Sequence, residues 1–200
     1  MYRLTDIYLK YLFDEYIELF ENFKNSLLKN DSVNILLNVN TLYDKLLSIT
    51  KEKLLELAQR QYDYIMQRNY DYSGINKEWL EELFENFDPT VKYVFINEVD
   101  RKRSRMYESV MSSNIPNEEI DKALTLWCRM IAQEAVSVTD EATLKAYRDS
   151  SVFELSWISE DDEKRCRHCK ELHGKIFRID EVPPKPHWNC RCYCVPVQKG

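Results

Sequence analysis

Apolar residues recur at intervals of three and four along most of the first 150 positions, with charged residues between them. Such spacing gathers the apolar side chains on one face of a helix and leaves the charged ones on the other. The pattern predicts amphipathic helices over residues 9–27, 33–65, 76–87, 89–113 and 117–147. We therefore expect a body built of packed helices.

Two of these helices contain a threonine at which the helix could be divided. The 33–65 stretch is either one long helix or two, with a break near 48–50 and Thr50 capping the second. In the last helix, Thr139 is a candidate cap for a continuation to Tyr147. Threonine is a favourable N-cap because its hydroxyl accepts a hydrogen bond from a backbone N–H of the first turn. The helix over 89–113 has a clearer start, because Asp88 is followed by Pro89.

The hydrophobic period changes to about 2 at Ser151. Phe153, Leu155 and Trp157 alternate with polar residues, which is typical of a half-buried strand. Short strand candidates follow at 175–179 and 193–197, separated by a proline-rich turn. The predicted fold class is therefore mainly α, with a helical body at residues 1–150 and a small α+β knob of short strands at residues 151–200.

Composition narrows the classes of function. The chain has 200 residues and only 3 glycines, and neither a P-loop nor a G-x-G-x-x-G motif is present, which excludes the usual nucleotide-binding loops. The net charge of −6 is unevenly divided, because residues 166–200 carry +4 and the residues before them −10. An acidic body does not suit non-specific DNA binding, whereas the basic tail could contact phosphate or an acidic partner.

The sequence also predicts an intracellular protein without membrane attachment. No apolar run is long enough to cross a membrane, and acidic residues interrupt the first 19 positions, where a signal peptide would need an apolar run. In a reducing compartment, clustered cysteines more often hold a metal than form disulfides.

Five of the six cysteines and all three histidines lie between Cys166 and Cys194. Cys166 and Cys169 form a Cys-x2-Cys pair, and a second Cys/His group follows at the separation typical of a tetrahedral zinc site. A knob of this size buries too little apolar surface to be rigid alone, so a structural zinc ion would stabilise it. The candidate ligands, in order, are Cys166, Cys169, Cys190 and then His187, with Cys192 as the main competitor for the fourth position.

Other interpretations of these residues remain open. The thiols could be reduced and packed without any metal, and Cys128 and Cys194 could be core residues. Catalysis is disfavoured, because four protein ligands leave zinc no open position and would occupy the thiolates that a Cys–His nucleophile needs. The acidic run at 161–163 and the basic run at 101–105 are more simply solvated surfaces than a nuclease site and a DNA contact.

The C-terminal third contains an ordered set of motifs. These are Trp157-Ile-Ser, Cys166-x2-Cys169, Leu172-x-Gly174, Pro183-Pro184 and His187-x-Asn189-Cys190-Arg191-Cys192, preceded by a helix with Arg129 and Glu134. The set resembles the C-terminal signature of the phage head-morphogenesis family, the Mu F-type minor head proteins. Two departures are Trp188, where the family usually has proline, and the extra thiol of Cys194.

The resemblance implies a non-enzymatic minor capsid protein, located in the phage head and, during assembly, in the host cytoplasm. Its expected partners are the portal protein and other capsid or scaffold proteins, with packaged DNA as a further candidate. One alternative is a phage zinc-dependent DNA-binding or nuclease factor that uses the basic tail. Another is a zinc-stabilised interaction module encoded by a prophage-bearing bacterium.

Overall fold

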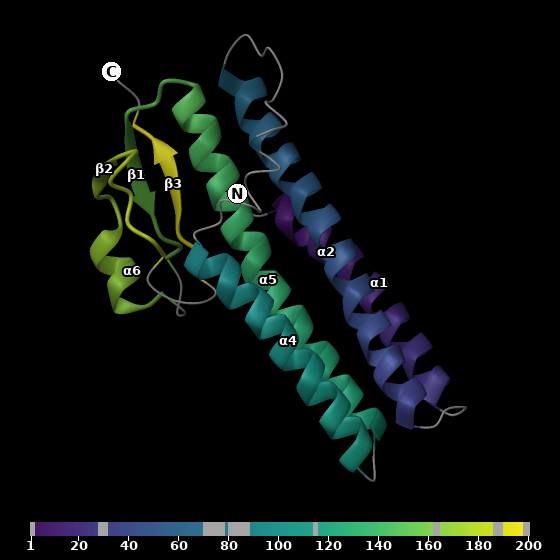
Figure 1. Ribbon diagram of the computed structural model, residues 1–200. Coiled ribbons are helices and arrows are strands. Elements are labelled where there is room, and N and C mark those ends of the chain that lie inside the picture. Colours follow the sequence, from purple (N-terminus) through teal and green to yellow (C-terminus); the bar gives the residue numbers. More distant parts are fainter. Residues whose placement is uncertain are drawn as a thin grey trace.

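The computed structural model describes residues 3–27, 32–69, 79, 89–113, 116–161, 165–185 and 190–197. Four long helices come first, and a three-stranded sheet follows: α1 (Arg3–Leu27), α2 (Ser32–Asn69), α4 (Pro89–Ser112) and α5 (Pro116–Asp149). The helices form an elongated bundle, and the sheet lies beside the C-terminal part of α5 (Figure 1). This arrangement confirms the predicted fold class. No helix within the described ranges is long and apolar enough to span a membrane.

The helices form where the apolar spacing predicted them. In α1, Leu12, Tyr16, Phe20 and Phe23 are all buried, and the acidic side chains of Asp14 and Glu18 point to solvent. Pro89 and Pro116 each occupy the first position of their helix, where the missing N–H of proline costs no hydrogen bond. The helix predicted over 76–87 lies outside the described residues except for Trp79.

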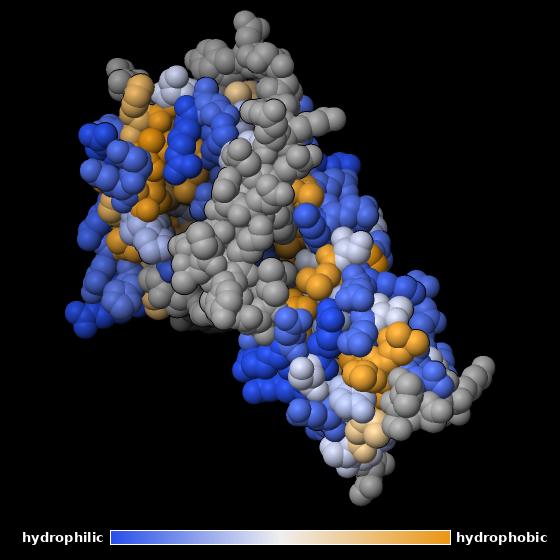
Figure 2. All heavy atoms as spheres, in the orientation of Figure 1, coloured by the Kyte–Doolittle hydropathy of each residue, from blue (hydrophilic) through white to orange (hydrophobic). Residues whose placement is uncertain are grey.

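The sheet consists of β1 (Glu154–Ile158), β2 (Ile176–Arg178) and β3 (Tyr193–Pro196) in the order β2-β1-β3, with both pairs antiparallel. All three strands overlap the predicted strand segments. Leu155 and Trp157 of β1 are buried, as the alternation predicted, and Trp157 lies opposite Cys194 of β3. On the face shown in Figure 2, apolar side chains gather over the sheet.

A short helix, α6 (Arg167–Leu172), connects β1 to β2 and was not predicted from the sequence. The turn after it requires Gly174, whose φ of +75° is in the left-handed region that glycine adopts without strain. Gly174 donates its N–H to the carbonyl of Trp157 at 2.8 Å, which joins this turn to β1. The turn thereby aligns β2 with β1.

The chain leaves α5 through a left-handed turn at Ser151, whose φ is +55°. Val152 donates its N–H to the carbonyl of Tyr147 at 2.9 Å, which is the six-residue closing bond of a Schellman motif. This hydrogen bond fixes the direction in which the chain enters β1. It therefore sets the position of the sheet against the bundle.

Two clusters of buried side chains hold the molecule together. The knob-end cluster joins the C-terminal halves of α2 and α5 to β1 and to four cysteines; it includes Leu57, Tyr62, Ala142, Leu155, Trp157, Cys169, Cys190, Cys192 and Cys194. The far-end cluster joins α1, α4 and the N-terminal halves of α2 and α5; it includes Tyr16, Phe20, Tyr43, Met106, Trp127 and Ile131. Because the knob-end cluster contains residues from both sides of position 150, the knob and the bundle share a core.

Neither threonine that could have divided a helix does so. α2 and α5 are continuous through Thr50 and Thr139, so the continuous alternative holds for α2 and the predicted cap at Thr139 is wrong. Each hydroxyl donates to the carbonyl four residues earlier, at 2.6 and 2.7 Å, and each also contacts α1, through Tyr16 and Thr5 respectively. The threonines therefore serve as buried contacts between helices, because their polar groups are satisfied without a helix end.

The Tyr16–Thr50 contact predicts unequal effects for its two partners. Thr50 Oγ1 donates to the Leu46 carbonyl, so the Tyr16 hydroxyl is the donor in its 2.6 Å bond to Thr50. Thr50→Val leaves the buried Tyr16 hydroxyl without its acceptor and should lower the free energy of unfolding by about 1–3 kcal/mol. Tyr16→Phe removes the donor itself and should lower the free energy of unfolding by about 1 kcal/mol. Urea denaturation of both variants measures the difference. A larger loss for Tyr16→Phe would contradict this assignment of donor and acceptor.

Candidate metal centre

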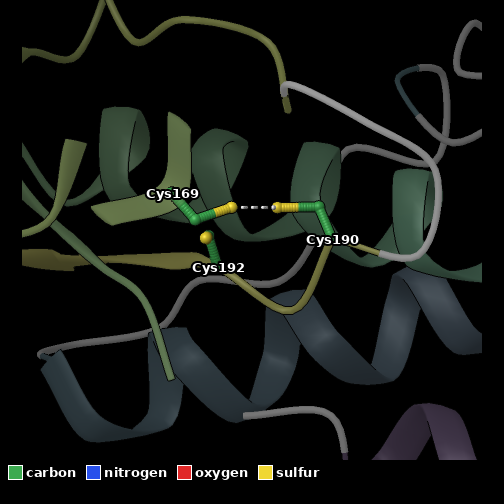
Figure 3. Close-up of side chains that lie close together, drawn as sticks. All are labelled: Cys169, Cys190 and Cys192. Atoms are coloured by element: carbon green, nitrogen blue, oxygen red, sulfur yellow. Dashed lines mark hydrogen bonds between the residues drawn. The ribbon is translucent and has the colours of Figure 1, made fainter. Parts of the chain in front are cut away.

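Three buried cysteines meet between α6 and the segment that leads into β3. Cys169 is on α6, and Cys190 and Cys192 come just before β3. Their exposed fractions are 4 %, 2 % and 2 %. The sulfurs of Cys169 and Cys190 face each other, and the sulfur of Cys192 lies next to them (Figure 3). We call these residues the cysteine triad.

The spacing of the triad fits a metal ion. All three Sγ atoms lie within 4.8 Å of one another, and those of Cys169 and Cys190 are 3.7 Å apart. Tetrahedral zinc with Zn–S bonds of about 2.3 Å places two sulfurs about 3.8 Å apart. All six cysteines are described, and none is in a disulfide. The triad could therefore hold a thiophilic metal ion such as zinc.

Cys166 places a fourth sulfur beside the triad. It is the N-cap of α6, and its Sγ accepts a hydrogen bond from the backbone N–H of Cys169 at 3.4 Å. The Sγ atoms of Cys166 and Cys169 are 3.3 Å apart. The first turn of α6 thus gives the Cys-x2-Cys pair the convergent geometry that its spacing predicted.

Burial raises the pKa of the thiols of Cys169 and Cys190. For Cys169, the neighbouring sulfurs raise the pKa further. A thiol with a raised pKa is protonated at neutral pH unless a cation is close to it. Metal binding must therefore displace protons, and the affinity for metal should fall as the solution becomes more acidic.

Two further cysteines are core residues outside the triad. Cys194 is buried in β3, and burial raises the pKa of its thiol to about 11. Cys128 of α5 is half-buried against the far-end cluster, and burial raises its pKa to about 11 as well. Both positions agree with the interpretation of these residues as small core side chains.

The predicted ligand His187 and the neighbouring Trp188 lie outside the described residues. His168 is exposed on α6. His173 follows α6, and its Nδ1 accepts a hydrogen bond from the backbone N–H of Ser159 at 3.1 Å. Both histidines thus lie at the surface or in a turn.

Several residues of the two charged runs on the surface are paired within the chain. In the basic run of α4, Arg101 and Lys102 contact Glu98, and Arg103 lies 2.9 Å from Asp44 of α2. These contacts favour a solvated, partly neutralised surface for this run. In the acidic run, Asp161 is exposed and pairs with Arg165, while positions 162 and 163 are outside the described residues.

Glu134, in the middle of α5, is a partly buried carboxyl group whose pKa is raised by burial. A carboxyl group whose pKa is higher in the folded state than in the unfolded state holds its proton more tightly when the protein is folded. The protein therefore loses stability as the pH rises above the pKa of the unfolded state. Glu134→Gln should therefore raise the melting temperature by a few degrees at pH 7 and change it little at pH 4. Thermal unfolding at the two pH values measures this, and an equal increase at both would contradict the role of ionisation.

Comparison with known proteins identifies part of the chain. Residues 116–195 match the model of the family described as Phage Mu protein F like protein. The match begins with α5 and includes β1, α6, β2, the cysteine triad and most of β3. No curated protein and no solved structure matches the sequence. The resemblance seen in the C-terminal motifs is thus confirmed, and it extends back to the start of α5.

Proposed function

Since residues 116–195 are a Phage Mu protein F-like domain, we propose that this protein is a minor head protein of a tailed phage or prophage. It acts in head morphogenesis as a structural, non-enzymatic component of the virion. The observation that carries the proposal is the position of the match, which includes α5, the sheet and all four cysteines at the candidate metal centre. The matched region therefore includes the buried centre that the geometry singles out.

We assign the metal a structural role. The triad, with a fourth ligand from Cys166 or His187, would hold zinc and tie α6 to the segment before β3. Four protein ligands leave zinc no open position for water or substrate, so the ion would stabilise the fold and supply no reaction chemistry. This role fits a small sheet of three short strands, which needs more than its own apolar burial to be stable.

The two predicted domains suggest a division of roles. The helical body at residues 1–150 docks on the portal or the inner capsid, and the module at residues 151–200 carries the metal. Packaged DNA is a further candidate partner. Residues 1–165 carry a net charge of −10, and in the basic run on α4 Arg101 and Arg103 pair with Glu98 and Asp44. Protein partners are therefore better supported than DNA, which binds positively charged surfaces.

Sedimentation with phage components tests the proposed partners. We expect the purified protein to co-sediment with its cognate portal protein or with proheads at low salt. No co-sedimentation at any salt concentration would contradict the docking. Retardation of duplex DNA with a steep salt dependence, or metal-dependent nicking that is lost in His187→Ala, would instead support the DNA-acting alternative.

Metal analysis tests the proposed zinc ion. The protein should contain about one equivalent of zinc per chain, and Cys169→Ser should lose it because a central ligand is missing. Cys128→Ser is a matched control, since Cys128 lies in α5 against the far-end cluster and should leave the zinc content unchanged. Less than about half an equivalent of zinc in the unsubstituted protein, together with unchanged folding of Cys169→Ser, would contradict a structural role for the metal.

A further inference from the structure

We infer that the metal is bound by sulfur alone, through Cys166, Cys169, Cys190 and Cys192, without His187. The inference rests on the proposed zinc ion and names its ligands. Spacing along the sequence favoured His187 over Cys192 for the fourth position. The structure brings the sulfurs of Cys169, Cys190 and Cys192 within 4.8 Å of one another and places the sulfur of Cys166 3.3 Å from that of Cys169. Two short segments thus offer four thiols, the number that a tetrahedral site needs.

The two segments contribute one pair of sulfurs each. Cys166 and Cys169 come from the first turn of α6, with their sulfurs 3.3 Å apart. Cys190 and Cys192 come from the segment before β3, and both lie within 4.8 Å of the Cys169 sulfur. Cys190 and Cys192 are each only 2 % exposed. Cys192 is therefore buried as completely as Cys190, which the sequence had placed ahead of it as a ligand.

Charge favours an all-thiolate site. Zinc with four thiolates has a net charge of −2, which nearby cations stabilise. A basic residue stands directly beside every one of the four cysteines in the sequence: Arg165, Arg167, Lys170 and Arg191. Arg165 and Arg167 pair with Asp161 and Glu171, at 2.6 and 2.8 Å, so carboxylates partly neutralise these two. Three of these four residues, Arg167, Lys170 and Arg191, belong to the segment 166–200 with its positive net charge.

The remaining cysteine of the knob serves as an internal control. Cys194 is also buried, but it lies within β3, opposite Trp157 of β1. Removing Cys194 deletes a buried thiol close in sequence to Cys192 without removing a proposed ligand. Comparison of Cys192→Ala with Cys194→Ala thus separates loss of a ligand from loss of packing.

Cobalt substitution tests the ligand set in solution. The thiolate-to-cobalt charge-transfer band should fall by about a quarter in Cys192→Ala, because one of four metal–sulfur bonds is lost. The band and the visible d–d spectrum should be unchanged in Cys194→Ala and in His187→Ala. A changed d–d spectrum in His187→Ala, with Cys192→Ala unaffected, would overturn the inference while leaving the structural metal intact.

X-ray absorption at the zinc edge identifies the ligand atoms in the unsubstituted protein, so this test does not depend on whether the variants fold. We expect a single shell of four sulfurs at about 2.3 Å. A component with nitrogen at about 2.0–2.1 Å would show a histidine ligand and overturn the inference. Failure of the unsubstituted protein to bind either zinc or cobalt would contradict the proposed metal as well.

Discussion

Cys169→Ala is expected to loosen half of the helical bundle as well as the knob. Cys169 belongs to the knob-end cluster, which also contains Leu57 and Tyr62 of α2 and Ala142 of α5. If Cys169 is a ligand of the proposed zinc ion, the variant loses a metal site, which is among the few changes that cost more than about 4 kcal/mol. For a chain of 200 residues, such a loss should lower the melting temperature by about 10 °C or more.

Hydrogen exchange detects how far this effect extends. Peptides covering 54–65 of α2 and 135–147 of α5 should lose protection in Cys169→Ala together with residues 151–197. Peptides covering 12–23 of α1 should keep theirs, because their buried residues belong to the far-end cluster. Cys128→Ala is the control, and its effect should be restricted to the far end. Exchange that increases only within residues 151–197 would show that the two parts do not share a cooperative core.

Trp157→Ala should have an effect of similar size for a different reason. The Trp157 side chain is 2 % exposed, lies opposite Cys194 and packs edge-on against Phe177, with ring centroids 6.4 Å apart. Removing a buried tryptophan side chain costs about 3–5 kcal/mol. The variant should therefore unfold at a markedly lower urea concentration.

Trp157→Phe is the matched variant that separates the aromatic ring from the indole N–H. Among the described residues, the buried Nε1 of Trp157 has no hydrogen-bond partner, so its removal sacrifices no bond. Trp157→Phe should then cost less than half as much as Trp157→Ala, since most of the apolar volume remains. Equal costs for the two variants would indicate that the indole N–H is bonded in the folded protein. Urea denaturation followed by circular dichroism gives both values.

The long helices and the strands could be predicted from the sequence because each has an apolar face with a clear period. The alternation of Leu155 and Trp157 predicted β1, and both side chains are buried as expected. The ordered motifs from Trp157 to Cys192 likewise indicated the family, because their residue types and spacing are characteristic without reference to packing. These features are local, so neighbouring residues contain the information.

The other features depend on contacts between distant residues. Thr50 and Thr139 are acceptable helix caps by type, and only their contacts with α1 show that they are buried within continuous helices. α6 has six residues, too few for a helical period to be recognised. The spacing of the cysteines predicted a metal centre, but the convergence of Cys192 with Cys169 depends on the path of the chain through β2 and β3. The core shared by knob and bundle depends on the packing of α2 and α5.

The uninterrupted course of α5 has a mechanical consequence. Its 34 residues contain no glycine and no proline after the first position, so the helix has no point at which it would readily bend. At 1.5 Å per residue, it spans about 50 Å. A partner held at the far end of the bundle would therefore lie at a fixed distance from the cysteine triad. The protein can act as a rigid spacer whose length is set by a single helix.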